Sequence, residues 1–261
     1  MAGEIYIDNL PFSERVAPAS SARLGLVVLA SDYTLEAEFR NILSLMPEQA
    51  VELFHARIAN SPNVTPQTLR AMGPLLKQTA ETLLPGDDLD VVAYGCTSAS
   101  FVLGPDEVNE TLQNAKPGAR NTNPASAAFA AMQAFGAKRI AVLTPYRRDV
   151  NEHVMRGLQA GGLEIASFGS FNEERDPVVA MIDNESLESG IRTLLKVATV
   201  DAVFVSCTSI KMVDDISRLE SVFGLPITSS NHAMAWHCLR LAGVEELPCE
   251  LGQLFTRKLA N

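Results

Sequence analysis

The tripeptide Cys-Thr-Ser occurs twice in this 261-residue chain, at 96–98 and at 207–209. Each copy follows a short apolar run, and valine-rich runs of this length are typical of buried parallel strands. A side chain at the carboxyl end of such a strand lies where open α/β sheets bind ligands. A single strand-end cysteine is more often inert packing. Recurrence in the same context favours chemistry, so Cys96 and Cys207 are candidate catalytic residues that face one cleft.

Threonine and serine follow each cysteine, and both residue types cap helices. We therefore expect each cysteine to lie beside backbone N–H groups at a helix start. Such a setting lowers the pKa of a thiol and favours the nucleophilic thiolate. Cys238 and Cys249 lack this context, and we expect ordinary behaviour of their thiols.

Two thiols on opposite faces of a small substrate can act in two ways. They can move a carbon-bound proton from one face to the other, which inverts a stereocentre. Alternatively, one thiol adds to a double bond while the other handles the proton, which allows rotation and re-elimination. Both routes need donors for a substrate carboxylate, and hydroxyls and backbone N–H groups at helix starts supply them. Thr97, Ser98, Thr208 and Ser209 are candidates for this role, and all four can also be plain helix caps.

Other classes of site and partner lack support. The chain has no Gly-x-Gly-x-x-Gly, no P-loop and no Gly-x-Ser-x-Gly motif. Its four histidines have no metal-ligand spacing with the cysteines, so we expect no metal and no cofactor. Lys and Arg number 21 against 31 Asp and Glu, without a basic block, which argues against nucleic acid. Without a long apolar run or signal peptide, we expect no membrane contact and a cytoplasmic protein with reduced thiols.

Strand and helix signals alternate along the chain, which predicts parallel sheets with right-handed crossovers. The expected strands are 24–30, 51–56, 89–94, 139–143, 163–168, 201–205 and 225–228. Two helices are expected to begin near 34 and after the cap at 229–231. The other expected helices span 66–83, 106–115, 124–135, 149–160, 187–198, 213–223 and 250–259. We expect a long polar loop around Asp176-Pro177, with a short helix near 178–182.

The order of elements repeats in the second half of the chain. We therefore expect an α/β fold of two similar lobes with parallel sheets, related by a pseudo-twofold axis, and an active site in the cleft between them. A single doubly wound sheet is the alternative, and the repeated motif disfavours it. The expected lobes are 1–122 plus 230–261, and 123–229. Residues 1–22 are irregular and could reach a partner subunit, so we expect a homo-oligomer.

The paired Cys-Thr segments, the Thr144-Pro145-Tyr146 loop and the Ser230-Asn231 helix start resemble the aspartate/glutamate racemase superfamily. Within it the chain is similar to the maleate cis–trans isomerase and arylmalonate decarboxylase branch, especially its ectoine-utilisation proteins. The resemblance covers about 23–243, and its most specific parts are 95–100 and 206–208. It implies two Rossmann-like lobes, an active site between them and no cofactor.

The resemblance also assigns roles to individual residues. Cys96 matches the nucleophilic cysteine of maleate isomerases, and Cys207 matches their second, acid/base cysteine. The decarboxylases keep only the second cysteine and have glycine at the first, so the pair favours an isomerase or racemase. Tyr146 matches a tyrosine that contacts a substrate carboxylate.

One position departs from the family pattern. Maleate isomerases carry Pro-Ser-x-Asn after the first strand, and this asparagine binds a substrate carboxylate, whereas residues 29–32 here are Leu-Ala-Ser-Asp. An ionised Asp32 in the site would repel a dicarboxylate and attract a cationic nitrogen. The substrate would then carry an amine or amidinium group beside its carboxylate, as amino acids and ectoine-type compounds do. Alternatively, Asp32 only caps the following helix.

These observations together predict a cofactor-independent isomerase or racemase/epimerase that acts on a small carboxylate. The resemblance to ectoine-utilisation proteins implies a substrate from ectoine or hydroxyectoine degradation. Two alternatives stay open. One is an arylmalonate-type decarboxylase, and the other is a non-catalytic protein that binds a metabolite in the same cleft.

Overall fold

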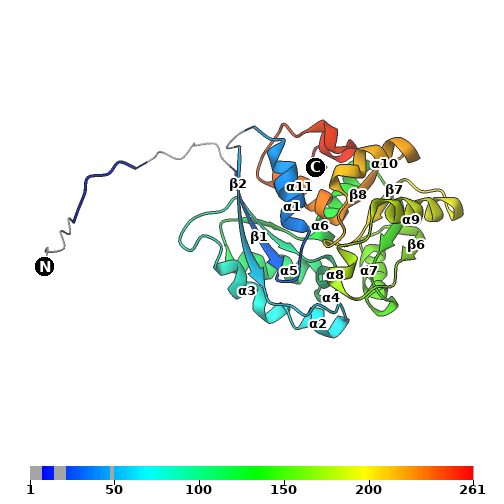
Figure 1. The fold of residues 1–261 in the computed structure, drawn as a ribbon, viewed down its shortest axis with the longest axis horizontal. Helices are drawn as coiled ribbons and strands as arrows, with labels where there is room; N and C mark the ends of the chain where they lie inside the picture. The colour runs from blue at the N-terminus through cyan, green and yellow to red at the C-terminus, as the bar shows by residue number, and fades with distance from the viewer. Residues whose placement is uncertain (1–7, 15–21, 48–49, 261) are drawn as a thin grey trace, which may run out of the picture.

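The computed structural model describes residues 8–14, 22–47 and 50–260, which form two four-stranded parallel sheets (Figure 1). The first sheet has the order β2-β1-β3-β4, from β1 (Ala22–Leu29), β2 (Val51–Ile58), β3 (Val91–Gly95) and β4 (Arg120–Thr122). The second has the order β6-β5-β7-β8, from β5 (Arg139–Thr144), β6 (Glu164–Ser170), β7 (Ala202–Val205) and β8 (Ile227–Ser229). The two separate sheets, with the same strand order, confirm the predicted pair of α/β lobes. The alternative of a single doubly wound sheet is wrong.

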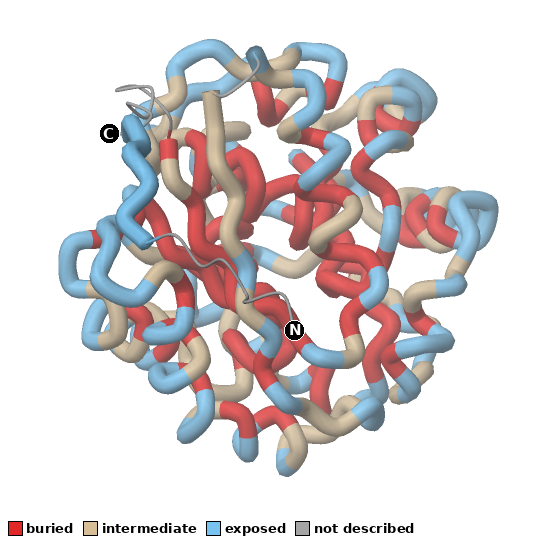
Figure 2. Tube along the Cα trace, turned by 60° about the vertical axis from the view of Figure 1, so that its left-hand side comes forward, coloured by how far each residue is buried: buried red, intermediate tan, exposed pale blue. Residues whose placement is uncertain are grey.

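Helices cover both faces of the first sheet because its strands are apolar on both sides. Leu24, Leu26 and Val28 of β1 pack in one hydrophobic cluster with helices α1 (Leu35–Ser44) and α11 (Ser230–Leu241). Val27 and Leu29 of β1 belong to a second cluster, with α3 (Gly73–Glu81) and α5 (Pro105–Ala115). Buried chain accordingly runs through the centre of the molecule, and exposed segments lie at its periphery (Figure 2).

Helix α11 links the end of the chain to its beginning. It contacts α1 and β3 of the first lobe, and also α6 (Pro124–Phe135). These contacts join α11 to elements of both predicted lobes, so the assignment of residues 230–261 to the first lobe and the boundaries at 122/123 and 229/230 stay a prediction. The remaining helices are α4 (Thr97–Leu103), α7 (Arg148–Ala160), α8 (Asp176–Val179), α9 (Asn184–Val197) and α10 (Ile216–Phe223).

Two predicted helices differ from the structure, and one strand was not predicted. The helix expected over 66–83 is two helices, α2 (Pro66–Arg70) and α3, because Pro74 has no N–H to continue the hydrogen-bond ladder. The helix expected over 250–259 is two 3₁₀ turns, Cys249–Leu251 and Gln253–Thr256, separated by Gly252 at a φ of 109°. The short strand β4 was not predicted.

The N-terminal arm lies largely outside the described residues, which exclude 1–7 and 15–21. In the part of the chain that the structure describes, no helix has the length and apolar character needed to cross a membrane.

Candidate active site

The two cysteine motifs meet at one cavity. Cys96 directly follows β3, and Cys207 lies two residues after β7, which is the equivalent strand of the second sheet. Both thiols line a cavity that the two lobes enclose. Its volume is about 20 Å³, which is room for about one water molecule. The structure therefore places the predicted pair together in a closed state.

Gly95 fixes the approach of β3 to the start of α1. A Cβ at this position would lie 2.2 Å from Cδ2 of Leu35 and 3.2 Å from the carbonyl oxygen of Val27. Only glycine allows this close packing, so the residue before Cys96 carries no side chain. The position of Cys96 thus depends on the packing of α1 against the strand end.

Cys96 is the N-cap residue of α4, as the sequence predicts. Its carbonyl oxygen accepts hydrogen bonds from the N–H and the hydroxyl of Ser100, and its Sγ lies 3.7 Å from Oγ of Ser98. Burial nevertheless raises the pKa of the Cys96 thiol to about 11. The Ala99 N–H and the Ser98 hydroxyl act in the opposite direction without compensating for the lost hydration.

Cys207 has a different local setting from the one expected. No helix begins directly after it, because the next helical turn is the 3₁₀ turn Val213–Asp215. The Ser209 N–H donates to its Sγ at 3.3 Å. Burial, with a smaller effect of Asp176, raises the pKa of this thiol to about 12, although the Tyr146 hydroxyl and the Ser209 N–H lower it.

The expectation of low thiol pKa values at the two motifs is therefore wrong for this closed state. Strand-end placement is correct, but exclusion of water outweighs the local N–H groups. Cys238 is buried in the core, where burial raises its pKa to about 12, and Cys249 is exposed. The buried thiol of Cys238 therefore differs from the ordinary behaviour expected for it, and this residue packs in the core.

Tyr146 lies against both catalytic candidates. It follows β5 and lines the cavity together with Cys207 and Ser98, and its hydroxyl acts to lower the pKa of the Cys207 thiol. Its backbone carbonyl accepts from Nδ2 of Asn151 at 2.8 Å and from the hydroxyl of Ser170. Two neighbouring elements, α7 and β6, therefore hold the Tyr146 loop in place.

The four hydroxyl residues predicted to bind the carboxylate divide into two groups. Ser98, Thr208 and Ser209 line the cavity together with the cysteines. Thr97 does not belong to the lining residues, and its hydroxyl donates to Oγ of Ser230 at 2.8 Å. Thr97 therefore ties the first motif to α11, which is a structural role.

The second motif is also anchored from outside. Nδ2 of Asn231 donates to the Thr208 carbonyl at 2.8 Å and to Oε2 of Glu38 at 2.7 Å. The other oxygen of Glu38 accepts the N–H groups of Met212 and Val213. Burial raises the pKa of Glu38 to about 7. The turn after Cys207 is thus held by α1 and α11.

Asp32 caps α1. Its Oδ1 accepts the N–H groups of Thr34 and Leu35, each at 2.7 Å. Its Oδ2 is buried without a hydrogen-bond partner among the described residues, and burial raises the pKa of the carboxyl to about 6. Asp32 is not a lining residue of the cavity. These contacts favour the capping interpretation.

Asp176 is a cavity residue that the sequence interpretation missed. It begins α8, is 4% exposed, and accepts hydrogen bonds from the hydroxyls of Ser209 and Ser31, the latter at 2.6 Å. Ser31 is held in turn by Asn60, whose Nδ2 lies 2.8 Å from its Oγ. The available signal was the position of Asp176-Pro177 after a parallel strand, at the sheet edge where ligands bind.

Two loops close the cavity. The Val64 N–H donates to the Glu174 carbonyl at 2.9 Å, and the Asp176 N–H donates to the Pro62 carbonyl at 3.0 Å. Asn63 and Arg175 form an antiparallel bridge between these bonds. We call residues 62–64 and 174–176 the clasp, because they join the two lobes over the thiols.

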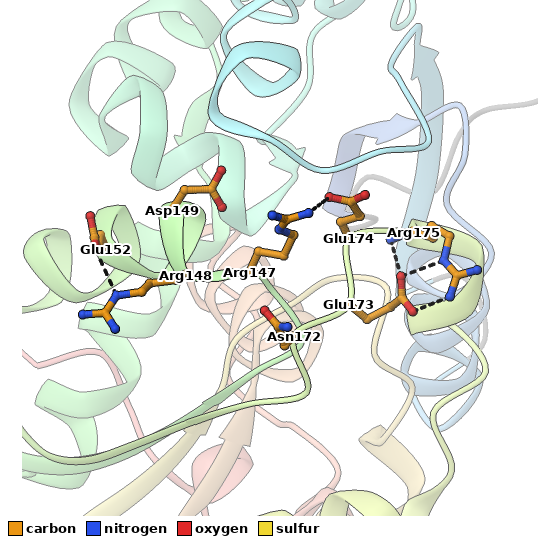
Figure 3. A pocket seen from close by; sticks show the side chains of 8 residues that line it. All are labelled: Arg147, Arg148, Asp149, Glu152, Asn172, Glu173, Glu174 and Arg175. Atoms are coloured by element: carbon orange, nitrogen blue, oxygen red, sulfur yellow. Dashed lines mark hydrogen bonds and ion pairs between the residues drawn. The ribbon is translucent and has the colours of Figure 1, made fainter.

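A larger and more open hollow lies next to the clasp (Figure 3). Ion pairs occupy its walls, namely Arg147–Glu174, Arg148–Glu152 and Arg175–Glu173. Neither cysteine lines this hollow. It therefore lacks the reactive groups that distinguish the closed cavity.

Comparison with known proteins identifies the family of this chain. The family model described as arylmalonate decarboxylase matches residues 50–255. The maleate isomerase of Nocardia farcinica (strain IFM 10152) is 29% identical over 226 residues, which cover 84% of this chain and 89% of that protein. The arylmalonate decarboxylase of Bordetella bronchiseptica is 29% identical over 123 residues, 47% of this chain and 51% of that protein.

Solved structures show the same architecture. The Nocardia farcinica maleate cis–trans isomerase bound to TRIS has a TM-score of 0.81 at 28% identity, and the match covers 90% of this chain and 97% of that one. A Cys-to-Ala variant of the maleate isomerase Iso from Pseudomonas putida S16, with maleate, has a TM-score of 0.83 at 24% identity and 90% and 98% coverage. The chain therefore belongs to the arylmalonate decarboxylase family, which includes the maleate isomerases, within the Asp/Glu racemase superfamily.

Proposed function

We propose that the protein is a cofactor-independent isomerase or racemase/epimerase in which Cys96 and Cys207 act on opposite faces of a small carboxylate. The single observation that carries this proposal is the shared cavity: two buried thiols from equivalent strand ends line it together with Tyr146. Ser98, Thr208, Ser209 and Tyr146 are the proposed contacts of the carboxylate, because they are the hydroxyl residues of the lining that belong to the two cysteine motifs and to the loop after β5.

In the cis–trans route the Cys96 thiolate adds to one carbon of the substrate double bond. A C–S bond forms, and the π electron pair moves to the neighbouring carbon, where Cys207 supplies a proton. The former double bond is now single and rotates. Cys207 removes the proton, the electron pair re-forms the double bond, and the thiolate leaves, so atoms and charge balance without a co-reactant.

In the racemisation route no C–S bond forms. One cysteine, as thiolate, removes the proton from the carbon beside the carboxylate, and the other cysteine, as thiol, delivers a proton to the opposite face. The pair then finishes with its protonation states exchanged. Both routes need one thiolate and one thiol in the same cavity.

A relative supports the addition route. A structure of the Nocardia farcinica maleate cis–trans isomerase, 26% identical with a TM-score of 0.82, is described as a Cys-to-Ser mutant with a covalently bound succinylcysteine intermediate. Such an adduct is what thiol addition to a four-carbon unsaturated dicarboxylate produces. The match to a decarboxylase family model keeps decarboxylation as the second candidate. Ectoine-type compounds belong to the substrate panel because of the sequence resemblance alone.

The test is deuterium incorporation at carbon and product formation over a panel of maleate, aspartate, hydantoins, ectoine and hydroxyectoine, with reductant present. Cys96→Ser and Cys207→Ser should each lose at least about 1,000-fold in kcat/KM, because neither half-reaction completes without its partner. Cys249→Ser is the matched control, since this cysteine is exposed and remote from the cavity lining. Turnover that persists in both motif variants would exclude a two-cysteine mechanism. The expected homo-oligomer is tested on the same preparations by light scattering.

A further inference from the structure

The carboxylate of Asp176 is the one acidic group that lines the thiol cavity in the described part of the chain. Its two oxygens accept from hydroxyls on opposite sides, Ser31 of the first lobe and Ser209 beside Cys207. Both partners are neutral, so no direct contact compensates the charge of the ionised carboxylate. A buried charge without an opposite charge is costly.

No basic side chain of the described residues offsets this charge by direct pairing. None of the ion pairs found among them involves Asp176 or Asp32. Arg57 is near Asp32, but its guanidinium pairs with Glu36 and donates to the carbonyls of Leu29, Ala30 and Asp32. The cation that would balance Asp176 is therefore not supplied by these contacts.

The negative potential extends to the rest of the site. The free oxygen of Asp32 is buried, and the Asp176 charge contributes to the raised pKa of Asp32. The same carboxylate contributes to the raised pKa values of Cys96 and Cys207. A thiolate and Asp176 thus repel each other in this cavity until a positive charge enters.

Building on the proposed function, we infer that Asp176 is a specificity-determining residue that binds a positively charged nitrogen group of the substrate. The substrate is accordingly a small carboxylate with a protonated amine or amidinium group, and a dicarboxylate is disfavoured. Its carboxylate faces the hydroxyls of Ser98, Thr208 and Tyr146, and its cation faces Asp176.

Charge balance explains the preference. A dicarboxylate would bring a second negative group towards Asp176 while one cysteine must also become a thiolate. A cationic group compensates Asp176 and thereby favours thiolate formation in the same step. Specificity of this kind combines attraction to one substrate with repulsion of its competitor.

Asp176 also has a structural role, since its backbone N–H belongs to the clasp. Asp176→Asn separates the two roles. The amide keeps one acceptor for one serine hydroxyl and offers an N–H to the other, whose hydroxyl can rotate to accept. The backbone bond to Pro62 is unchanged, so the substitution removes the charge and preserves the shape.

The primary test measures binding with unreactive probes, 4-aminobutyrate and succinate, by titration calorimetry. The wild-type protein should bind 4-aminobutyrate more tightly. Asp176→Asn should change the affinity ratio by about 100-fold in favour of succinate, because like charges in a desolvated site are strongly unfavourable. Asp183→Asn is the matched control: it removes one charge from the α9 cap, where asparagine caps equally well.

Asp32→Asn identifies which aspartate discriminates, and it should shift the ratio less than Asp176→Asn does. A wild-type protein that prefers succinate or fails to bind 4-aminobutyrate would overturn the inference, even if Asp176→Asn does not fold. So would an unchanged ratio in Asp176→Asn, or a larger shift in Asp32→Asn.

A turnover measurement separates this inference from the proposed function. cis-4-Aminobut-2-enoate and maleate differ chiefly in one charged end, and their cis–trans conversion is followed by NMR. Cysteine-dependent turnover without charge selectivity would overturn the inference alone. Charge-selective binding without cysteine-dependent turnover of any panel compound would overturn the proposed function and leave the cation subsite intact.

Discussion

The two cavity thiols are held in their neutral form. A thiol whose pKa is about 11, as burial produces for Cys96, is thiolate in only about one molecule in 10,000 at pH 7. The neutral thiols avoid two negative charges in a closed cavity that already contains the Asp176 carboxylate. Formation of the reactive thiolate is therefore a step that opening of the site or binding of the substrate must assist.

This state predicts a steep pH dependence. Because both folded-state pKa values lie above the working range, the thiolate fraction of the free enzyme should grow about tenfold per pH unit between pH 6 and 9. We expect kcat/KM to follow this slope. Asp176→Asn should move the profile to lower pH, since the carboxylate contributes to the raised pKa of both thiols. A profile that is flat above pH 7 for a non-titrating substrate would show that the thiolate already exists in the free enzyme.

The sequence locates the residues adjacent to the strand ends but not those that approach from loops. Cys96, Ser98 and Tyr146 follow strands directly, so their place at the sheet edge is readable from order alone. Asp176 reaches the cavity through a loop whose path depends on the bonds of the clasp, and residue order does not encode this path. The burial of the two thiols depends on the contact between the lobes. The direction in which their pKa values shift could therefore not be predicted from the sequence.

At the scale of elements, the contact between β3 and α1 sets the position of the first motif. Leu35 begins α1 and packs on Gly95, while Asp32 caps the same helix from the end of β1. Three elements therefore converge within one turn of Cys96. A small displacement of α1 moves the nucleophile relative to the substrate carbon.

Gly95→Ala tests this contact. The new methyl group would overlap Leu35, and overpacking of this kind costs about 1–3 kcal/mol of stability. We expect a lower Tm and a fall in kcat/KM beyond the loss of folded protein. Gly118→Ala is the matched control, because its Cβ would meet only Oδ1 of Asp88 at 3.7 Å. Equal stability and activity of the two variants would show that the β3–α1 contact tolerates the methyl group.

Helix and strand positions were readable where local signals agree with the tertiary structure. Asn123 caps α6 by accepting the N–H groups of Ala125 and Ser126, as the Asn-Pro pair predicts. The prediction of a single helix over 66–83 was wrong because the apolar spacing of this segment continues through Pro74, which interrupts the hydrogen-bond ladder. β4 is three residues long and exists by pairing with β3, so its own residues contain too little pattern to reveal it.

At the scale of the whole molecule, the two lobes form a closed cavity joined by the clasp. A cavity of about 20 Å³ is too small for any carboxylate of four carbons, so substrate must enter through a more open arrangement. The clasp is the part that spans both lobes above the thiols, and its two backbone hydrogen bonds together make the Asn63–Arg175 bridge. Because the clasp contains few hydrogen bonds, separating its two loops costs less free energy than rearranging either sheet.

A reversible lock tests whether opening of the clasp admits the substrate. Asn63 and Arg175 face each other in an antiparallel bridge, where Cα atoms lie about 4.5–5.5 Å apart, within reach of a disulfide. The oxidised Asn63→Cys/Arg175→Cys protein should lose most of its turnover, and a thiol reductant should restore it.

The wild-type protein and both single variants, treated with the same oxidant, control for damage to Cys96 and Cys207. Mass mapping verifies the cross-link before activity is measured. The disulfide blocks entry to the cavity but leaves the two thiols unchanged. Iodoacetamide should therefore label Cys96 and Cys207 more slowly in the cross-linked protein than in the reduced one. Full turnover by a protein with a verified cross-link would mean that substrate reaches the thiols by a route that leaves the clasp closed.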